Sequence, residues 1–192
     1  GVFDYLKNNL HLNKENINNF QINNFNDFKK YFYKTDHHWN NVGSYKGYQE
    51  LTELLKIENF LKYQNQKCID NFNGSKSLVI GGGSLLYNED FCAYQFDISN
   101  HITKVNKQNS EYGDEKAFFE NKLSTINYAI YNGDDNGLVY YDFKNPNQDN
   151  LLIIGDSFDN AISKLLASHF NKTFVVDLRN YERELNEKFS IN

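Results

Sequence analysis

The clearest hydrophobic pattern lies in the last quarter of the chain. Residues Leu151 to Ile154 form a short, wholly apolar run, which is typical of a strand buried on both faces of a parallel sheet. The residues after Gly155-Asp156-Ser157 place apolar side chains at helical spacing: Ala161, Ile162, Leu165, Leu166 and Phe170. A second apolar run follows at Phe174 to Val176. This order predicts a βαβ unit with parallel strands and a right-handed connection.

Helical spacing also appears twice near the start of the chain. The segment from Phe20 to Tyr33 carries aromatic residues three and four positions apart, which predicts one irregular helix packing on the core. The pair Asn40-Asn41 is a typical helix cap. The residues after it place apolar side chains on one helical face: Tyr45, Tyr48, Leu51 and Leu55.

The middle of the chain has weaker patterns. The segment 77–86 reads as two short strands around the glycine turn Gly81 to Gly83. The segment 97–120 is polar and is predicted to be a loop. The segment 128–131 reads as a strand, and a turn at 132–137 separates it from another strand at 138–143.

Length and composition favour one folded domain over the whole chain, residues 1–192. The hydrophobic fraction is 40% and the aromatic fraction 16%, enough apolar material for a core. The net charge of -5 and the lack of a basic stripe argue against a nucleic-acid partner. The sequence shows no apolar run long enough for a membrane span and no signal-peptide pattern. The two cysteines, Cys68 and Cys92, fit either a bridge or two buried thiols.

Candidate chemistry gathers at the turn after the first βαβ strand. Ligands of open parallel sheets bind at the carboxyl ends of the strands, close to helix N-termini, and Ser157 falls there. The helix that follows supplies unpaired N–H groups and a partial positive charge, both of which favour an oxyanion. A Gly-Asp-Ser triplet is also an ordinary strand-to-helix connection, in which Asp or Ser serves as the cap.

A serine nucleophile needs a base, and the base benefits from a carboxylate that fixes its tautomer. His38 and Asp36 are the candidates, because side chains two residues apart in an extended segment lie on the same side. The same Asp-His-His-Trp residues also fit a helix cap followed by a core indole. A third reading has Asp36, His37, His38 and Asp156 bind a divalent cation.

Other polar residues carry weaker signals. Arg179 follows the second βαβ strand and fits either an anionic sugar or an ion pair with Asp177 or Glu182. The Gly81 to Gly83 run lacks the remaining residues of a phosphate loop or a dinucleotide motif. We assign no catalytic role to three histidines: His11, His101 and His169.

Two blocks of the sequence together resemble the DHHW protein family. The first is Thr35-Asp36-His37-His38-Trp39, followed by Val42-Gly43-Ser44-Tyr45 and Tyr48. The second runs from Leu151 through Gly155-Asp156-Ser157-Phe158 and continues at His169-Phe170 and Val176 to Tyr181. Weaker likeness extends through Asn71 to Ser75 and Tyr131 to Gly133. The family is similar to the SGNH-like domains of alginate O-acetylation proteins, within the SGNH/GDSL-like hydrolase superfamily.

The resemblance implies a three-layer α/β/α SGNH-like, flavodoxin-like fold with a parallel sheet. The opening residues, Gly1 to Asp4, resemble the later part of such a domain's first half, so we expect a fragment of a longer chain that lacks N-terminal strands. Carried over, Asp36, His38 and Ser157 take the roles of a catalytic triad, and Trp39 is expected to be a packing residue, with a substrate platform as the alternative. We expect the oxyanion or substrate-binding contacts from four residues: Asn132, Gly133, Asn160 and Arg179.

The function implied is a bacterial serine esterase or O-acetyltransferase that acts on acyl esters of a cell-envelope polysaccharide, without metal or cofactor. The expected partners are an acylated glycan of the cell surface and a membrane-bound acyl-transfer protein. The expected location is outside the cytoplasm, in the envelope or secreted, with any anchor beyond these residues. A non-catalytic glycan-binding or scaffold domain of the same architecture is the alternative.

Overall fold

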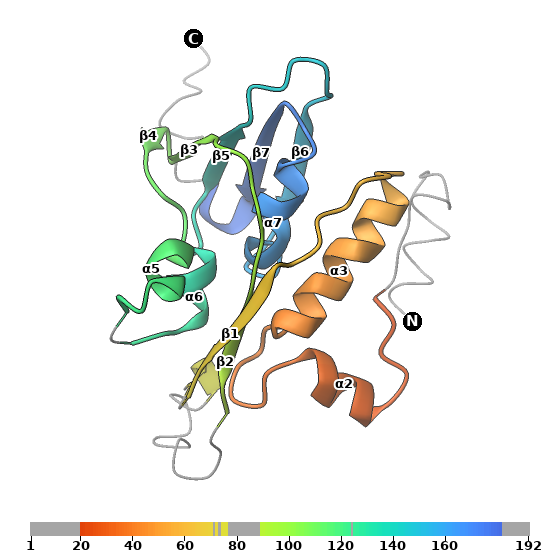
Figure 1. Ribbon diagram of the computed structural model, residues 1–192, viewed down its shortest axis with the longest axis vertical. Coiled ribbons are helices and arrows are strands. Elements are labelled where there is room, and N and C mark those ends of the chain that lie inside the picture. The colour runs from red at the N-terminus through yellow and green to blue at the C-terminus, as the bar shows by residue number, and fades with distance from the viewer. Residues whose placement is uncertain (1–19, 71, 73, 77–88, 124, 182–192) are drawn as a thin grey trace.

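A computed structural model describes residues 20–181, except positions 71, 73, 77–88 and 124 (Figure 1). None of the helices among these residues combines the length and the apolar character needed to cross a bilayer. The elements described are α2 (Phe25–Tyr31), α3 (Asn41–Leu54), β1 (Asn65–Ile69), β2 (Phe91–Gln95), β3 (Ile102–Val105), β4 (Gln108–Asn109), α5 (Glu115–Phe119), α6 (Tyr128–Asn132), β5 (Leu138–Asp142), β6 (Leu151–Gly155), α7 (Asn160–Ala167) and β7 (Lys172–Asp177).

The predicted βαβ unit is confirmed as β6, α7 and β7. Strands β6 and β7 are parallel, with Leu151 opposite Thr173 and Gly155 opposite Asp177. The apolar face of α7 is buried, as the helical spacing predicts, and includes Ile162, Leu165 and Leu166. This unit therefore sets the position of the turn that carries Ser157.

The larger sheet is mixed, and not parallel as the resemblance implied. Its order is β4-β3-β5-β7-β6, and β6 with β7 is its one parallel pair among the described residues. Two parallel neighbouring strands need a crossover of a dozen or more residues between them. The connection from β6 to β7 provides this crossover, and it contains α7. The other pairs are antiparallel: β3 turns directly into β4, and β5 pairs with β3 and β7 across longer stretches of chain. The α/β class is therefore correct and the parallel sheet is not.

Helices stack on one face of this sheet. Helix α7 packs through Ala167 against Val139, Tyr141 and Val175, and α3 packs in turn on α7 around Tyr48. The opposite face exposes three large apolar side chains by 43–60%: Leu152, Ile154 and Phe174. The described residues thus show a sheet and two helical layers on one side, and the predicted α/β/α sandwich is not confirmed.

Both N-terminal helices begin at asparagine caps. Asn40 accepts hydrogen bonds from the N–H groups of Val42 and Gly43, as predicted for α3. Asn24 caps α2 in the same way, so this helix is shorter than the predicted 20–33 segment. The helix packs on α3, in line with the predicted packing on the core, although none of its residues is fully buried.

Two predictions for the middle of the chain are wrong. The segment 128–131 is helical, because the side chain of Asn127 accepts the N–H of Ile130 and begins α6. The polar segment 97–120 contains β3, β4 and α5, and left-handed backbone at Asn106 and Lys107 turns β3 into β4. The predicted strands around Gly81 to Gly83 lie outside the described residues.

A second sheet, of β1 and β2, carries the two cysteines opposite each other. Cys68 and Cys92 form a disulfide, which settles the choice between a bridge and two buried thiols. Beside this sheet lies a mainly aromatic core cluster: Tyr33, Phe72, Phe91, Ala93, Phe118 and Tyr128. Tyr33 lies five residues before His38 in the same loop, so this cluster anchors the loop that carries His38.

Candidate functional site

Ser157 lies on the turn between β6 and α7. The turn is closed by Asp156, whose carboxylate accepts the N–H of Phe158 at 3.0 Å and whose carbonyl accepts the N–H of Asp159 at 3.1 Å. Glycine is required before it, because a Cβ at Gly155 would lie 2.8 Å from Cγ of Asp159. The local sequence therefore holds the serine at the carboxyl end of a strand and just before a helix N-terminus.

His38 and Asp36 lie on the loop between α2 and α3. Glu89 holds the start of this loop through its carboxylate, which accepts the N–H groups of Lys34 and Thr35 at 2.8 Å each. Residues Phe32 and Trp39 close the loop by an isolated antiparallel bridge. The loop is thus fixed at both ends, so its side chains have defined directions.

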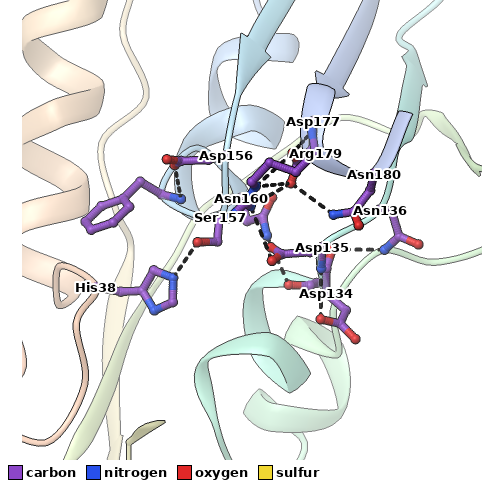
Figure 2. A network of polar contacts seen from close by, with 12 residues as sticks. His38, Asp134, Asp135, Asn136, Asp156, Ser157, Asn160, Asp177, Arg179 and Asn180 are labelled. Atoms are coloured by element: carbon purple, nitrogen blue, oxygen red, sulfur yellow. Dashed lines mark hydrogen bonds and ion pairs between the residues drawn. The ribbon is translucent and has the colours of Figure 1, made fainter. Parts of the chain in front are cut away.

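The structure brings the three predicted side chains together. Nε2 of His38 lies 2.8 Å from Oγ of Ser157, and Nδ1 of His38 lies 2.6 Å from Oδ1 of Asp36. Figure 2 shows the imidazole of His38 pointing at the serine hydroxyl. Asp36 and His38 are buried, with 3% and 7% of their surface exposed, whereas Ser157 is half-buried.

The hydrogen-bond pattern assigns the histidine tautomer. Burial by itself raises the pKa of Asp36, but hydrogen bonds from the His38 side chain and from the N–H groups of Ser75 and His38 lower it well below its usual range. The carboxylate is therefore ionised and accepts hydrogen bonds without donating any. Nδ1 of His38 must carry the hydrogen that Asp36 accepts, so in the tautomer with this single ring hydrogen Nε2 accepts the serine O–H.

Tyr128 is a site residue that the sequence analysis missed. Its ring stacks on His38 with centroids 3.7 Å apart and planes 3° from parallel. Its hydroxyl donates to the carbonyl of Ser157 at 3.2 Å. One tyrosine thus fixes both the imidazole plane and the serine backbone. The signal in the sequence was the cap Asn127, which marks the start of the helix that presents this ring.

The residues around Asp36 were missed as well. Ser75 donates its N–H to Oδ2 of Asp36 at 2.7 Å, and its hydroxyl lies 2.9 Å from Nδ1 of His37. Gly74 packs so closely that a Cβ there would lie 2.4 Å from Cβ of Asp36. The weak likeness noted at Asn71 to Ser75 was the available signal.

The other predicted binding residues take different positions. Asn160 opens α7, where its amide donates to the carbonyl of Gly133 at 3.3 Å and its oxygen accepts the hydroxyl of Tyr112 at 2.8 Å. Asn132 lines a cavity of about 80 Å³ that Ser157 does not line. Gly133 ends α6 with a φ of 90°, a conformation that favours glycine.

Arg179 forms the predicted ion pair with Asp177. Nη2 of Arg179 lies 2.6 Å from Oδ2 of Asp177 and 3.2 Å from Oδ2 of Asp135 (Figure 2). The guanidinium therefore ties the end of β7 to the loop after α6. Its partners are carboxylates, so the anionic-sugar reading has no support here, and Glu182 lies outside the described residues.

Three of the four residues predicted as metal ligands lie close together. Asp36, His37 and His38 each offer a ligand atom within 4.8 Å of the others, but Asp156 does not belong to the group. Asp36 already accepts hydrogen bonds on both oxygens, and His38 bonds through both ring nitrogens. Binding a cation would break those hydrogen bonds, so the arrangement suits proton transfer better than metal coordination.

The remaining histidines and the tryptophan have structural contacts. Nε2 of His169 lies 2.7 Å from the Tyr48 hydroxyl, and Nδ1 of His101 lies 2.9 Å from the Ser99 carbonyl. Trp39 packs against α3, where a Cβ at Gly47 would lie 2.7 Å from the indole. His11 lies outside the described residues.

Comparison with known proteins gives matches in structure alone. No family model matches the sequence, and no curated protein matches it. The fold is similar to that of a DHHW family protein from Eubacterium siraeum, at 20% identity and a TM-score of 0.57, over 83% of this chain and 56% of that one. It is also similar to Bacillus cereus PatB1, at 24% identity and a TM-score of 0.58, over 86% of this chain and 61% of that one.

A second structure of PatB1, with a sulfonyl adduct, matches at 22% identity and a TM-score of 0.57, over 96% of this chain and 60% of that one. The chain thus spans well under two thirds of the length of these solved structures. At such identities the likeness shows a DHHW- or PatB1-like fold and no more.

Proposed function

We propose that this chain is an SGNH-type serine esterase or O-acetyltransferase in which Ser157, His38 and Asp36 act as a catalytic triad. One observation carries the proposal: the continuous hydrogen-bonded path from Ser157 Oγ through both ring nitrogens of His38 to Asp36. Nucleophile, base and orienting carboxylate are the groups that acyl transfer requires, in the order it requires.

The reaction follows from the assigned tautomer. Oγ of Ser157 attacks the ester carbonyl while Nε2 of His38 takes the hydroxyl proton, and the Asp36 carboxylate stabilises the imidazolium. The tetrahedral intermediate then collapses: the bond to the leaving oxygen breaks, His38 returns the proton to that oxygen, and an acyl-serine remains. Water or a sugar hydroxyl attacks the acyl-serine by the same steps, which gives hydrolysis or transfer.

The developing negative charge needs donors that are already in place. The N-terminus of α7 begins just after Ser157, so the serine N–H and the helix dipole are candidates. The amide of Asn160 is the nearest predicted side-chain donor, and Tyr112 and Gly133 fix its orientation. If the Asn160 amide stabilises the transition state, the Asn160→Ala variant should have a lower kcat.

An envelope polysaccharide is the substrate class we propose. The disulfide between Cys68 and Cys92 supports a location outside the cytoplasm, because such bonds persist in oxidising compartments. The sequence resemblance to the SGNH-like domains of alginate O-acetylation proteins supports a glycan acceptor. In this proposal a membrane-bound partner delivers the acyl group when the reaction is transfer.

A chromogenic acetyl ester tests the catalytic assignment. We expect the purified chain to hydrolyse 4-nitrophenyl acetate and the Ser157→Ala variant to lose this activity. Ser99→Ala serves as the matched control, since Ser99 is exposed and distant in sequence from the site. Activity persisting in Ser157→Ala, or lost equally in Ser99→Ala, contradicts the proposal.

The cluster of Asp36, His37 and His38 gives the metal-dependent reading a separate test. A metal hydrolase loses activity in EDTA and regains it when zinc or manganese is added. The serine mechanism predicts the same rate before and after chelation. Glycan binding without turnover in any acyl-ester assay would favour the non-catalytic alternative.

A further inference from the structure

A row of aromatic rings leads from the surface of α2 to the site. We define the aromatic stripe as Phe25, Phe28, Phe32 and Phe158. The rings of Phe25 and Phe28 lie 6.4 Å apart and 7° from parallel, and those of Phe28 and Phe32 lie 4.8 Å apart and 6° from parallel. Phe32 contacts Phe158 edge-on at 6.5 Å, and Phe158 lies 5.1 Å from the ring of His38.

The outer end of the stripe is open to solvent. Phe25 is 71% exposed and Phe28 is 38% exposed, and no residue of α2 is buried. Contiguous exposed apolar patches mark binding surfaces, and Phe25 and Phe28 lie against each other. Because the rings continue to His38, the patch extends directly from the proposed site.

Positive charge follows the stripe. Nζ of Lys29 lies 4.8 Å from the ring centroid of Phe25, and Nζ of Lys76 lies 6.0 Å from that of Phe28. Lys30 and Lys34 are also exposed, and Asp27 is the one acidic residue within α2. Glu89 and Asp90 lie beside Lys29 and Lys34, so the positive charge is confined to α2 and its flanks, in a chain whose net charge is -5.

The opposite side of Ser157 is acidic. Figure 2 shows Asp134, Asp135 and Asp177 on the side of the serine away from His38, with Arg179 already paired to two of them. These carboxylates repel a negatively charged ligand from that side, and the lysines of α2 attract one, while the exposed carboxylate of Asp156 beside Phe158 opposes this attraction close to the serine. The charge distribution therefore gives the site a direction.

We propose that the aromatic stripe binds the sugar rings of an anionic polysaccharide and leads one of its residues to Ser157. Because neighbouring rings of the stripe already stack on each other's faces, the sugar contacts the exposed surface of Phe25 and Phe28, and the lysines beside these rings pair with acidic groups of the glycan. This inference rests on the proposed function only for the reaction at Ser157. The binding of glycan to the aromatic stripe does not depend on that reaction.

An anionic membrane would also attract phenylalanines and lysines. The polysaccharide is favoured because the rings lie against one another in a row that ends at the histidine, which suits a linear polymer. A membrane-inserting surface gains nothing from contact with His38. The two partners are separated by experiment.

The test measures binding by affinity electrophoresis in gels that contain hyaluronan, polygalacturonate or neutral hydroxyethylcellulose. We expect retardation in an anionic gel that weakens with added salt, and about tenfold weaker binding for Phe25→Ala, the loss of one aromatic contact. Lys29→Gln should weaken binding as well. Phe60→Ala is the matched control, because Phe60 is exposed by 36% and lies outside the stripe.

Each alternative outcome overturns the inference. No retardation in either anionic gel, equal binding by wild type and Phe25→Ala, or an equal loss in Phe60→Ala would do so. Binding to phosphatidylglycerol vesicles that depends on Phe25, without glycan binding, would assign the surface to a membrane. The Ser157→Ala variant should bind glycan as wild type does, so failure of the ester assay and failure of the stripe are distinguishable.

Discussion

Replacing Asp36 by asparagine separates the charge of this residue from its shape. The carboxylate accepts three hydrogen bonds: Oδ1 from Nδ1 and N of His38, at 2.6 and 3.0 Å, and Oδ2 from N of Ser75 at 2.7 Å. An amide has one acceptor oxygen, so its NH2 group must face either His38 or the Ser75 N–H. In the first orientation Nδ1 becomes an acceptor, and Nε2 then carries the hydrogen and no longer accepts the serine proton.

Both orientations oppose two donors in a buried place, because the NH2 group faces the backbone N–H of His38 in the first and that of Ser75 in the second, which costs about 1–3 kcal/mol of folding stability. We therefore expect Asp36→Asn to lower kcat for 4-nitrophenyl acetate by about 10³ to 10⁴, the effect of a wrong tautomer in serine proteases, with a modest loss of stability. Steady-state kinetics and thermal unfolding measure the two effects. Asp97→Asn is the control, since Asp97 is exposed.

The pH dependence of stability offers a second measurement on the same variant. The folded pKa of Asp36 is lowered, so the ionised carboxylate contributes stability above its ordinary pKa of 3.8, and this contribution is lost as the pH falls below that value. Asp36→Asn lacks the contribution, and its stability should fall less steeply in acid. A variant that is folded and keeps more than a tenth of the wild-type kcat refutes the reasoning.

Three further predictions concern other parts of the fold. Burial and the nearby carboxylates of Asp156 and Asp177 raise the pKa of Asp159 to about 7, so the free energy of unfolding should fall as the pH rises from about 4 to 7. Urea unfolding of Asp159→Asn should show a flatter slope and a gain of about 1 kcal/mol at pH 8, after allowance for solvent screening. Reduction of the disulfide between β1 and β2 should lower the free energy of unfolding by about 2–4 kcal/mol, measured by urea unfolding with and without reductant, and an unchanged midpoint would contradict this. Gly47→Ala should destabilise by about 1–3 kcal/mol, because its Cβ would meet the Trp39 indole at 2.7 Å, and an unaltered Tm would count against that packing.

The parts of the fold predicted from the sequence are those whose signal is local. The apolar run at Leu151 to Ile154 and the helical spacing after it specify strand and helix by periodicity, and Asn40 specifies a helix start by its side-chain acceptor. These elements formed as predicted. They also place Ser157 correctly, because the end of a strand and the start of a helix define the turn between them.

The errors fall where partners distant in sequence decide the structure. β3 is a four-residue strand within a mainly polar segment, and it forms because β5 pairs with it along four residues. The sheet is mixed because β5 pairs antiparallel with β3 and β7, neither of which is its neighbour in sequence, and such pairing is not specified by the sequence of any single strand. Tyr128 joins the site through stacking on His38, a contact that no spacing in the sequence reveals.

Two carboxyl groups near Ser157 show how the fold assigns different roles to one residue type. Asp36 is surrounded by three N–H donors, which keep it charged and fixed against His38. Asp159 has a buried Oδ2 without a hydrogen-bond partner among the described residues, and the like charges of Asp156 and Asp177 favour its neutral form. The pKa values of the two groups are therefore driven in opposite directions. The negative charge of Asp36 therefore lies next to the imidazolium that it stabilises. At the N-terminus of α7, where an oxyanion would develop, protonation of Asp159 removes a negative charge that would oppose the oxyanion.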